Sequence, residues 1–462
     1  MWLATMLVAT WSIYIQDGHI NRDGLLYLKQ AYLIADGSWK EGLKLYPWPF
    51  FSILIAVFHK VTNIHLQVVA HAVDLSLFGI AAMFYLKILK LIHKEKGIIF
   101  YGGIILLSFM PIMDDYVGMI LRDHGLWAGC MIGTYFYFKN LKKYSLKNSI
   151  SWQLGFLFSG LFRPEGWVFL LLLPLWRLAQ HKSQNLKKLV HDYLLSISIV
   201  TFGLVVIFLS YCDLIGLINS SRLIEFFNRP IVFFHQLVSP LPIVSDNFHL
   251  SNLLEDYSLV LTYSVLITIL LFKWIKGLGV LHGCMFFYSF LVKKKFLNEN
   301  QKNIYFFLVV SFILVAINLF NVYVLTNRYW GFHWWWLLIL ITPTTLSLFE
   351  VRNFRSSIKN ILGVVLVFYV FNSFIDKRDN LEMHIAQYLK NNHLEDIDLK
   401  EHHRIKYYVN FSVDDLLDNK TNQDPEPYGL YKIDDINNID QKMIIKKFPE
   451  INPKFILIQH AK

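Results

Sequence analysis

Long hydrophobic stretches separated by short charged ones dominate the chain up to about residue 375. An α-helix needs about 20 apolar residues to cross the hydrocarbon core of a bilayer, and most of these stretches approach that length. The pattern therefore predicts an all-α polytopic membrane bundle of about eleven transmembrane helices, at 1–15, 64–92, 97–112, 124–138, 150–162, 166–179, 190–212, 257–272, 303–323, 331–348 and 359–375. The stretch 278–292 is short and flanked by lysines, so we expect it to lie in the membrane interface instead of spanning.

Composition supports a membrane protein and excludes several other classes. The 462 residues are 55% hydrophobic and 17% charged, whereas soluble domains carry about 25% charged residues. The net charge of +10 comes from short Lys and Arg clusters between apolar stretches, so we expect no nucleic-acid partner. The three cysteines lack the spacing of a zinc site or a disulfide scaffold. The first span lacks a basic leader and a cleavage site, which favours an anchor over a removable signal peptide.

The Lys and Arg clusters also predict the sidedness of the chain, because cytoplasmic loops hold an excess of basic residues. With the N-terminus in the cytoplasm, the inner connections contain 21 basic residues and the outer ones 9. We therefore predict a multi-pass protein of a bacterial inner (plasma) membrane. Everything after the last span then lies on the extracytoplasmic, periplasmic side.

The composition changes at Lys377, which divides the chain into a transmembrane domain, 1–376, and a soluble C-terminal domain, 377–462. The second domain holds 13 Lys and Arg residues and 15 Asp and Glu residues. Residues 381–391 have helical spacing, while 405–409 and 455–459 are β-branched and aromatic runs typical of strands. We expect a small α/β domain that acts as a lid or docking module.

Acidic residues of the first domain gather on the predicted outer side, where 14 of its 19 acids lie. In the first outer segment, Asp23 precedes an amphipathic stretch that ends at Gly37, and a second amphipathic stretch occupies 49–61. Both are predicted to be helices in the membrane interface. Asp23 has two interpretations: it caps the first of these helices, or it is a general base at the membrane boundary.

Two further outer segments carry paired charges. Asp115, Arg122 and Asp123 lie close together between two spans, either as a reactive group or as a helix cap with a solvated charge. Arg163 and Glu165 interrupt what would otherwise be one long apolar run. Charges near hydrocarbon are costly unless they pair or meet a ligand, so we favour a functional role for this second pair.

Arg328 opens a fourth segment, TNRYWGFHWWW, at the outer end of a span. An arginine binds phosphate through its planar fork of donors, and the tryptophans could pack against a lipid or a sugar. The competing interpretation is an aromatic girdle with a snorkelling arginine. Asp74, with His71 one turn before it, lies inside a span; we expect it to be hydrogen-bonded within the bundle rather than part of a conduction path.

Taken together, the four outer segments resemble the GT-C superfamily of integral-membrane glycosyltransferases, in the branch of the protein O-mannosyltransferases and the bacterial aminoarabinose transferase that modifies lipid A. The tail, with its helix and its Tyr-Tyr pair, is also similar to bacterial members. One departure is Gly24, where family members often have Glu. The matching residues are Asp23 to Tyr27 with YPWPFFS after them, Asp115, Arg122, Asp123 and Trp127, RPEG at 163–166, and Arg328-Tyr329.

The resemblance implies a GT-C-like catalytic domain and a sugar donor linked to polyprenyl phosphate. It maps the catalytic carboxylates onto Asp23 and Asp123, although Asp17 is a second candidate for the base. We expect the base to take the proton of an acceptor hydroxyl and Arg163 or Arg328 to stabilise the departing phosphate, with inversion of the anomeric centre. The predicted substrate-binding residues are Asp17, Tyr27, Asp115, Arg122, Arg163, Glu165, Arg328, Tyr329 and His333.

No cofactor is predicted with certainty; the lipid-linked sugar is a co-substrate, and dependence on a divalent metal is left open. Expected partners are the polyprenyl-phosphate sugar, membrane lipid, and a glycan, glycolipid, lipid A or lipopolysaccharide, or protein acceptor. The main alternative is a polytopic transporter or flippase of lipid-linked sugars. A third is a membrane scaffold or O-antigen polymerase, but the segment 213–256 holds only two arginines.

Overall fold

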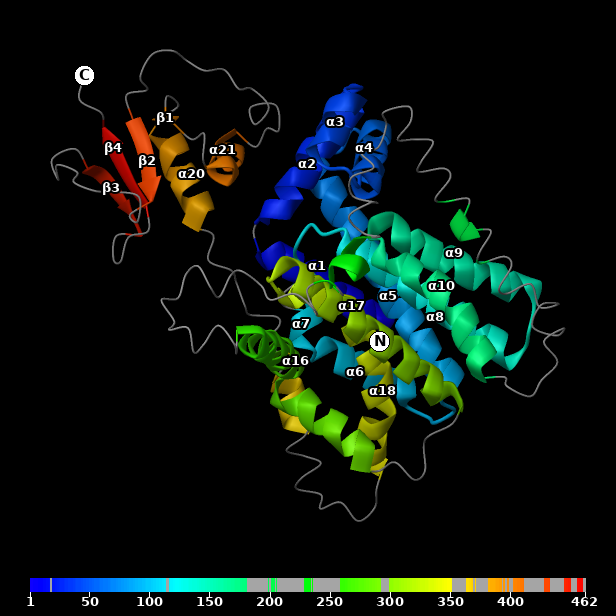
Figure 1. The fold of residues 1–462 in the computed structure, drawn as a ribbon. Coiled ribbons are helices and arrows are strands. Elements are labelled where there is room, and N and C mark those ends of the chain that lie inside the picture. The colour runs from blue at the N-terminus through cyan, green and yellow to red at the C-terminus, as the bar shows by residue number, and fades with distance from the viewer. Residues whose placement is uncertain are drawn as a thin grey trace.

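The structure is a computed structural model in which most described residues are helical (Figure 1). It describes residues 1–16, 19–113, 116–180, 198, 201–203, 205, 228–233, 235, 258–291, 299–350, 363–368, 370, 381–392, 394, 397–398, 402–410, 428–432, 444–449 and 455–459.

The helices of the first domain form a bundle (Figure 1). In residues 1–180 they are α1 (Trp2–Ile15), α2 (Arg22–Asp36), α3 (Trp39–Leu45), α4 (Phe50–Thr62), α5 (Leu66–Ile92), α6 (Ile98–Leu107), α7 (Met110–Met113), α8 (Asp123–Lys142), α9 (Leu146–Phe162) and α10 (Glu165–Gln180). Further along are α16 (Ser258–Leu291), α17 (Glu299–Val322), the 3₁₀ helix η1 (Asn327–Trp330) and α18 (Gly331–Glu350).

Described helices cover the predicted spans 1–15, 64–92, 124–138, 150–162, 166–179, 257–272, 303–323 and 331–348, whereas the predicted span 97–112 is divided between α6 and α7. Helices α2, α3 and α4 lie outside the predicted spans. The predicted spans 190–212 and 359–375 lie mostly outside the described residues. By length and composition, three described helices can cross a membrane: Leu66–Ile92, Val260–Ser289 and Lys302–Val322. The fold class is therefore a helical bundle with apolar helices of membrane-spanning length.

Helix α16 includes two stretches that were predicted as separate elements, 257–272 and 278–292. The joint is Gly279, whose φ of 62° and ψ of 176° are not helical. A positive φ is accessible to glycine at little cost because it has no Cβ. The stretch predicted to lie in the interface is therefore a helical continuation beyond a kink.

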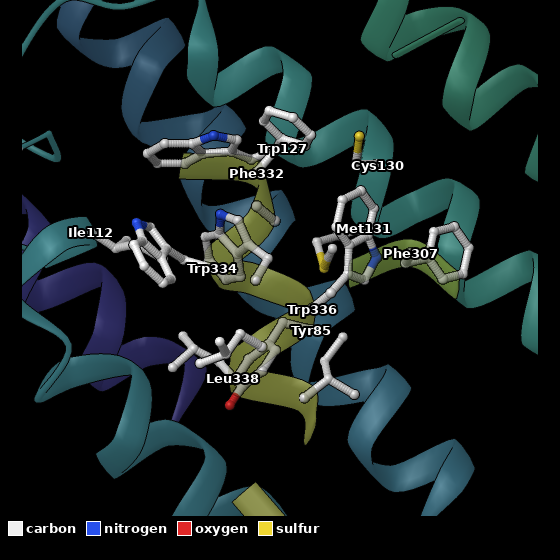
Figure 2. Packing of buried hydrophobic residues seen from close by; sticks show 14 of the residues in the cluster. Tyr85, Ile112, Trp127, Cys130, Met131, Phe307, Phe332, Trp334, Trp336 and Leu338 are labelled. Carbon is white, nitrogen blue, oxygen red and sulfur yellow. The ribbon is translucent and has the colours of Figure 1, made fainter. Parts of the chain in front are cut away.

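The centre of the bundle is aromatic. Trp334, Trp335 and Trp336 of α18 are fully buried, and Figure 2 shows α18 surrounded by side chains from α5, α7, α8 and α17. The Trp336 ring stacks on Phe307 with centroids 5.1 Å apart, and its Nε1 donates to the Thr134 hydroxyl at 3.1 Å. The aromatic girdle considered for these tryptophans is therefore wrong; they hold α18, and the η1 turn before it, in a fixed position.

The tail contains two helices, α20 (Leu381–Asn391) and α21 (His403–Asn410), and a sheet of order β1-β2-β4-β3. The strands are β1 (Ile397–Asp398), β2 (Tyr428–Lys432), β3 (Ile444–Phe448) and β4 (Phe455–Gln459). Strand β1 is parallel to β2, and the other pairs are antiparallel. The predicted helix 381–391 and strand 455–459 are confirmed.

The strand predicted at 405–409 is wrong, because these residues belong to α21. Ile405 and Tyr408, three positions apart, are both buried, as expected for one face of a helix. Arg404 also donates to Glu382 of α20 at 2.6 Å. Tertiary packing of this face overrides the strand preference of β-branched and aromatic residues.

The two amphipathic stretches of the first outer segment are helical, as predicted. Helix α2 ends where Gly37 adopts a φ of 96°, the left-handed conformation that commonly ends helices. Helix α4 covers the second amphipathic stretch. Tyr27 of α2 packs edge-on against Phe51 of α4, with ring centroids 5.3 Å apart, so the two helices form one unit above the bundle.

Candidate substrate pocket

A pocket of about 230 Å³ lies where the outer segments meet. Small-molecule sites usually measure about 300–1,000 Å³, so this one suits a small polar group better than a whole lipid. Its lining comes from α2, the connection after α3, the residue before α8, the turn between α9 and α10, the helical residues 228–233, and η1. The lining residues are Asp23, Leu26, Tyr27, Tyr46, Trp48, Arg122, Arg163, Pro164, Glu165, Arg229, Arg328 and Tyr329.

Two hydrogen bonds fasten the first outer segment to the second. The Asn21 side-chain amide donates to the Ile120 carbonyl at 3.2 Å, and its oxygen accepts from the Ile120 N–H at 3.0 Å. A Cβ added to Gly24 would lie 2.7 Å from the Asn21 oxygen and 3.0 Å from Ile120 Cβ. The chain therefore has no room for the larger residue that the resembling family often has at this position.

Asp23 points toward Arg328 instead of capping its helix. Helix α2 begins at Arg22 with Asn21 as its N-cap, so Asp23 lies inside the first turn. Its carboxylate accepts a hydrogen bond from Nη1 of Arg328. The cap interpretation is therefore wrong, and 45% of the Asp23 side chain remains exposed, which leaves it accessible from the pocket.

Asp123 bridges two arginines from distant parts of the chain. Its Oδ1 accepts from Arg163 Nη1 at 2.5 Å, and its Oδ2 accepts from Arg328 Nε at 2.6 Å. Only 1% of its side chain is exposed, so the solvated-charge interpretation is wrong. Because both oxygens are occupied, the geometry suits Asp123 for positioning the arginines more than for removing a proton.

Arg163 and Glu165 form the pair that the sequence suggests. Arg163 Nη2 and Nε donate to the two Glu165 oxygens at 2.7 and 3.3 Å. This two-pronged geometry fixes the plane of the guanidinium as well as its position. Arg163 is therefore held by two carboxylates, Glu165 and Asp123.

The two buried carboxylates, Asp123 and Glu165, lie at the N-terminal ends of α8 and α10, outside the predicted spans. Burial alone raises the pKa of the Asp123 carboxyl, but Arg328 and Arg163 more than offset this and hold it well below its usual range. For Glu165, burial again raises the pKa and Arg163 outweighs it, so the net shift is downward. Both groups are therefore ionised at neutral pH.

Aromatic rings support the cations of the pocket. The Arg163 guanidinium lies 5.2 Å from the centre of the Tyr329 ring, and that of Arg122 lies 5.0 Å from the Tyr46 ring. The Tyr27 hydroxyl oxygen accepts from Arg328 Nη2 at 3.4 Å. Rings in this position attract cations without adding a negative charge, so they support the arginines without changing the charge balance of the pocket.

Beneath the pocket, Asp74 anchors the start of α8. One of its oxygens is 2.9 Å from His124 Nδ1, and the other accepts from the Leu121 N–H at 3.0 Å. Asp74 and His124 are both buried. This agrees with the expected hydrogen-bonded role of Asp74. Its partners Leu121 and His124 lie on either side of Arg122 and Asp123 in the sequence, so the two bonds hold the turn that carries them.

His333 does not line the pocket. Its Nε2 accepts from the Trp274 indole at 3.0 Å, so its Nδ1 carries the hydrogen donated to Ser311 Oγ at 2.8 Å. Both ring nitrogens are therefore used within the bundle. The other predicted residues with described positions, Tyr27, Arg122, Arg163, Glu165, Arg328 and Tyr329, meet at the pocket, while Asp17 and Asp115 lie outside the described residues.

Five lining residues had no predicted role: Leu26 and Pro164, which adjoin predicted residues, and Tyr46, Trp48 and Arg229. Tyr46 and Trp48 belong to the aromatic run after α3, which the resemblance included without assigning either of them a role. Arg229 is one of only two arginines in 213–256, and this scarcity was its only signal. Its Nη1 donates to Asn318 Oδ1 at 3.2 Å.

Within the described residues, no group of three or more His, Cys, Asp or Glu side chains is arranged to hold a metal ion. The arrangement instead concentrates guanidinium groups around one exposed carboxylate. Comparison of the chain with protein-family models and with proteins of curated function finds no match.

Proposed function

We propose that the protein is an inverting glycosyltransferase that moves a sugar from a polyprenyl-phosphate donor to a hydroxyl acceptor at the outer face of a bacterial inner membrane. The observation that carries this proposal is the pairing of Asp23, an accessible carboxylate, with Arg328 in one pocket. The first is suited to receive a proton and the second to bind a phosphate.

The charge of the pocket supports an anionic ligand. Four guanidinium groups, those of Arg122, Arg163, Arg229 and Arg328, line it. The carboxylates that line it or bond to these arginines are those of Asp23, Asp123 and Glu165. One positive charge is therefore left over among these residues, and a phosphate neutralises it.

In the proposed reaction, the acceptor oxygen attacks the anomeric carbon while its proton passes to Asp23. The bond between the anomeric carbon and the phosphate oxygen breaks, and its electron pair leaves with the polyprenyl phosphate. Arg328 and Arg163 stabilise the charge that develops on this phosphate. A single displacement of this kind inverts the anomeric centre and requires no covalent enzyme intermediate.

The membrane arrangement belongs to the same proposal. A prenyl chain stays in lipid, so its phosphate and sugar are accessible only at the membrane boundary. We infer from the predicted eleven spans and cytoplasmic N-terminus that the pocket lies at the outer boundary and the tail domain on the extracytoplasmic side. The acceptor is then a glycan, a glycolipid such as lipid A, or a protein presented on that side.

The test uses purified protein in liposomes with a labelled polyprenyl-phosphate sugar and a panel of acceptors. Asp23→Asn is expected to lower transfer by about 100- to 10,000-fold, the usual contribution of general-base catalysis. Asp36→Asn, at the exposed far end of the same helix, is the matched control and should keep the normal rate. Unchanged transfer by Asp23→Asn contradicts the assigned base, and loss on Asp17→Asn instead would move the role there.

The same liposomes distinguish the flippase alternative. A transferase releases polyprenyl phosphate in proportion to the sugar transferred, whereas a flippase moves the intact lipid between leaflets. Movement of labelled lipid without release of polyprenyl phosphate, for every acceptor and sugar tried, would contradict the transferase.

A further inference from the structure

The tail is fastened to the first outer segment through α21, the tail helix that faces α2 in Figure 1. The Tyr408 hydroxyl oxygen accepts a hydrogen bond from the Ile20 N–H at 2.7 Å, across 388 positions of sequence. Tyr407 donates from its hydroxyl to Gln67 Oε1 at 3.0 Å. Both tyrosines are buried, so these bonds are shielded from water.

The contact is also apolar. Leu25 and Leu28 of α2 belong to one hydrophobic cluster with Ile405 and Tyr408 of α21. Burial of a leucine or isoleucine side chain contributes about 1.5–3 kcal/mol. Apolar packing and hydrogen bonds therefore both favour the docked arrangement.

The charges at this junction oppose docking. Lys29 follows Leu28 in α2, and Lys406 lies between Ile405 and Tyr407 in α21, so both lysines border the shared apolar cluster. Lys29 interacts electrostatically with Lys406, and His403 with Lys29, Lys406 and Arg22. Burial and then the charge of Lys406 lower the pKa of Lys29. Burial, followed by Lys29, Lys406 and Arg22, lowers the pKa of His403. Cations facing each other across an interface repel, and partial burial reduces their screening by water and salt.

Among the described residues, none of these four side chains forms an ion pair with an acid. Two acids on the helices at this junction, Asp23 of α2 and Glu382 of α20, already have arginine partners. Asp23 pairs with Arg328, and Glu382 pairs with Arg404. The junction therefore combines a favourable apolar contact with like charges that a separate anion would neutralise.

We propose that a phosphate-bearing ligand binds between α2 and α21, held by Lys29 and Lys406 with Arg22 and His403 beside them, and that it fastens the tail to the segment carrying Asp23. Phosphate fits because it brings up to two negative charges and several acceptor oxygens. Lys29 does not line the pocket and lies six residues beyond Asp23, about 9 Å further along the helix. This second site does not depend on the proposed transferase reaction.

The test measures hydrogen exchange of the α21 amides in the full-length protein, held in nanodiscs of neutral phosphatidylcholine. One arm adds inorganic pyrophosphate to the buffer, and the other replaces part of the lipid with phosphatidylglycerol. At least one arm is expected to slow exchange in α21 about tenfold or more. Slowing only by phosphatidylglycerol identifies a lipid headgroup as the source, and slowing only by pyrophosphate identifies a soluble phosphate compound.

The variant K29Q/K406Q removes the two central cations and should abolish this response. K40Q/K44Q removes two exposed lysines from α3 and is the matched control, which should respond like the natural chain. Without phosphate, α21 of K29Q/K406Q should exchange more slowly than the natural chain because the repulsion is gone. No slowing in either arm, an equal response in K29Q/K406Q, or faster unliganded exchange in that variant would each overturn the proposal.

Discussion

Two cationic regions on the predicted outer side of this protein are built in opposite ways. In the pocket, Arg163 and Arg328 are each bonded to carboxylates. At the junction, Lys29 and Lys406 border the apolar contact and repel each other, and neither forms an ion pair with an acid among the described residues. The pocket is thus held in shape before any ligand arrives, whereas the junction has to be neutralised from outside. Preorganised charge suits catalysis, and uncompensated charge suits a contact that opens and closes.

The largest effect on the pocket is expected from removing Asp123, the carboxylate that joins Arg163 and Arg328. Asp123→Asn leaves Arg163 and Arg328 without a shared partner, and loss of one member of a buried ion pair typically costs about 3–5 kcal/mol. We expect transfer to be lost and the free energy of unfolding in detergent to fall by about that amount. Asp36→Asn is the control, and an unchanged free energy of unfolding in Asp123→Asn would show that the bridge is not structural.

A smaller effect is expected from Arg328→Lys, which keeps the positive charge but removes the planar set of guanidinium donors. Arg328→Lys can contact Asp23 or Asp123 but cannot reproduce the three donors that now reach Asp23, Asp123 and Tyr27. Hydrogen bonds to charged groups contribute about 1.5–3 kcal/mol each, so transfer should fall about 10- to 100-fold. The measurement is kcat and KM for the lipid-linked donor; a normal kcat/KM would mean that charge alone suffices.

The anchor beneath the pocket can be tested by a pair of substitutions at His124. His124→Asn keeps a donor close to Asp74 and should retain most activity, whereas His124→Leu leaves the Asp74 carboxylate short of a partner. An unsatisfied buried group costs about 1–3 kcal/mol. We expect His124→Leu to lower kcat more than it changes KM. Equal activity of the two variants would limit Asp74 and His124 to filling space.

The ionisation of Glu165 makes its contribution depend on pH. The pKa of Glu165 is lower in the folded protein than in the unfolded chain. Its pairing therefore contributes fully to the free energy of unfolding above the ordinary glutamate pKa of about 4.3, and this contribution is lost as the pH falls through the depressed value. Glu165→Gln should therefore be less stable than the natural chain at pH 7, and the gap should narrow below about pH 4. A gap that is constant with pH would show that Glu165 acts through its shape.

The smallest effect is expected at the junction. Without phosphate, K29Q/K406Q should raise the free energy of unfolding by up to about 1 kcal/mol, the size of interactions between partly exposed charges. The natural chain should approach the variant as salt screens the repulsion. Melting curves at low and high ionic strength measure this, with K40Q/K44Q as the control. If K29Q/K406Q is less stable than the natural chain at low salt, the two lysines do not destabilise the junction.

The sequence predicted most of the pocket residues because charged residues are rare in this chain and each predicted outer segment contains at least one of them. Arg163 and Glu165 were expected either to pair or to meet a ligand; they pair with each other, and both line the pocket. His333 was misplaced because an apolar segment such as α18 gives no sign of which face meets the site. The strand assigned to 405–409 failed since α21 is stabilised by its contacts with α2 and α20, which are far away in sequence.

Roles were harder to predict than positions. Asp23 and Asp123 are both acids near the starts of helices, and the sequence did not separate them. Their surroundings do: 45% of the Asp23 side chain is exposed, against 1% of Asp123. Tyr46 and Trp48 were not assigned because aromatic residues are common at membrane boundaries. Only the folded structure shows that Tyr46 contacts Arg122 and Tyr27 and that Trp48 packs against Trp167.

The close approach of α2 to the second outer segment also limits how this sequence can diverge. Any side chain at Gly24 meets Asn21 and Ile120, and Asn21 is the residue that joins the two segments. A change at position 24 alone forces Asn21 or Ile120 to move, so positions 21, 24 and 120 are expected to vary together in descendants of this chain. A library randomised at all three positions should yield functional combinations that no single substitution reaches.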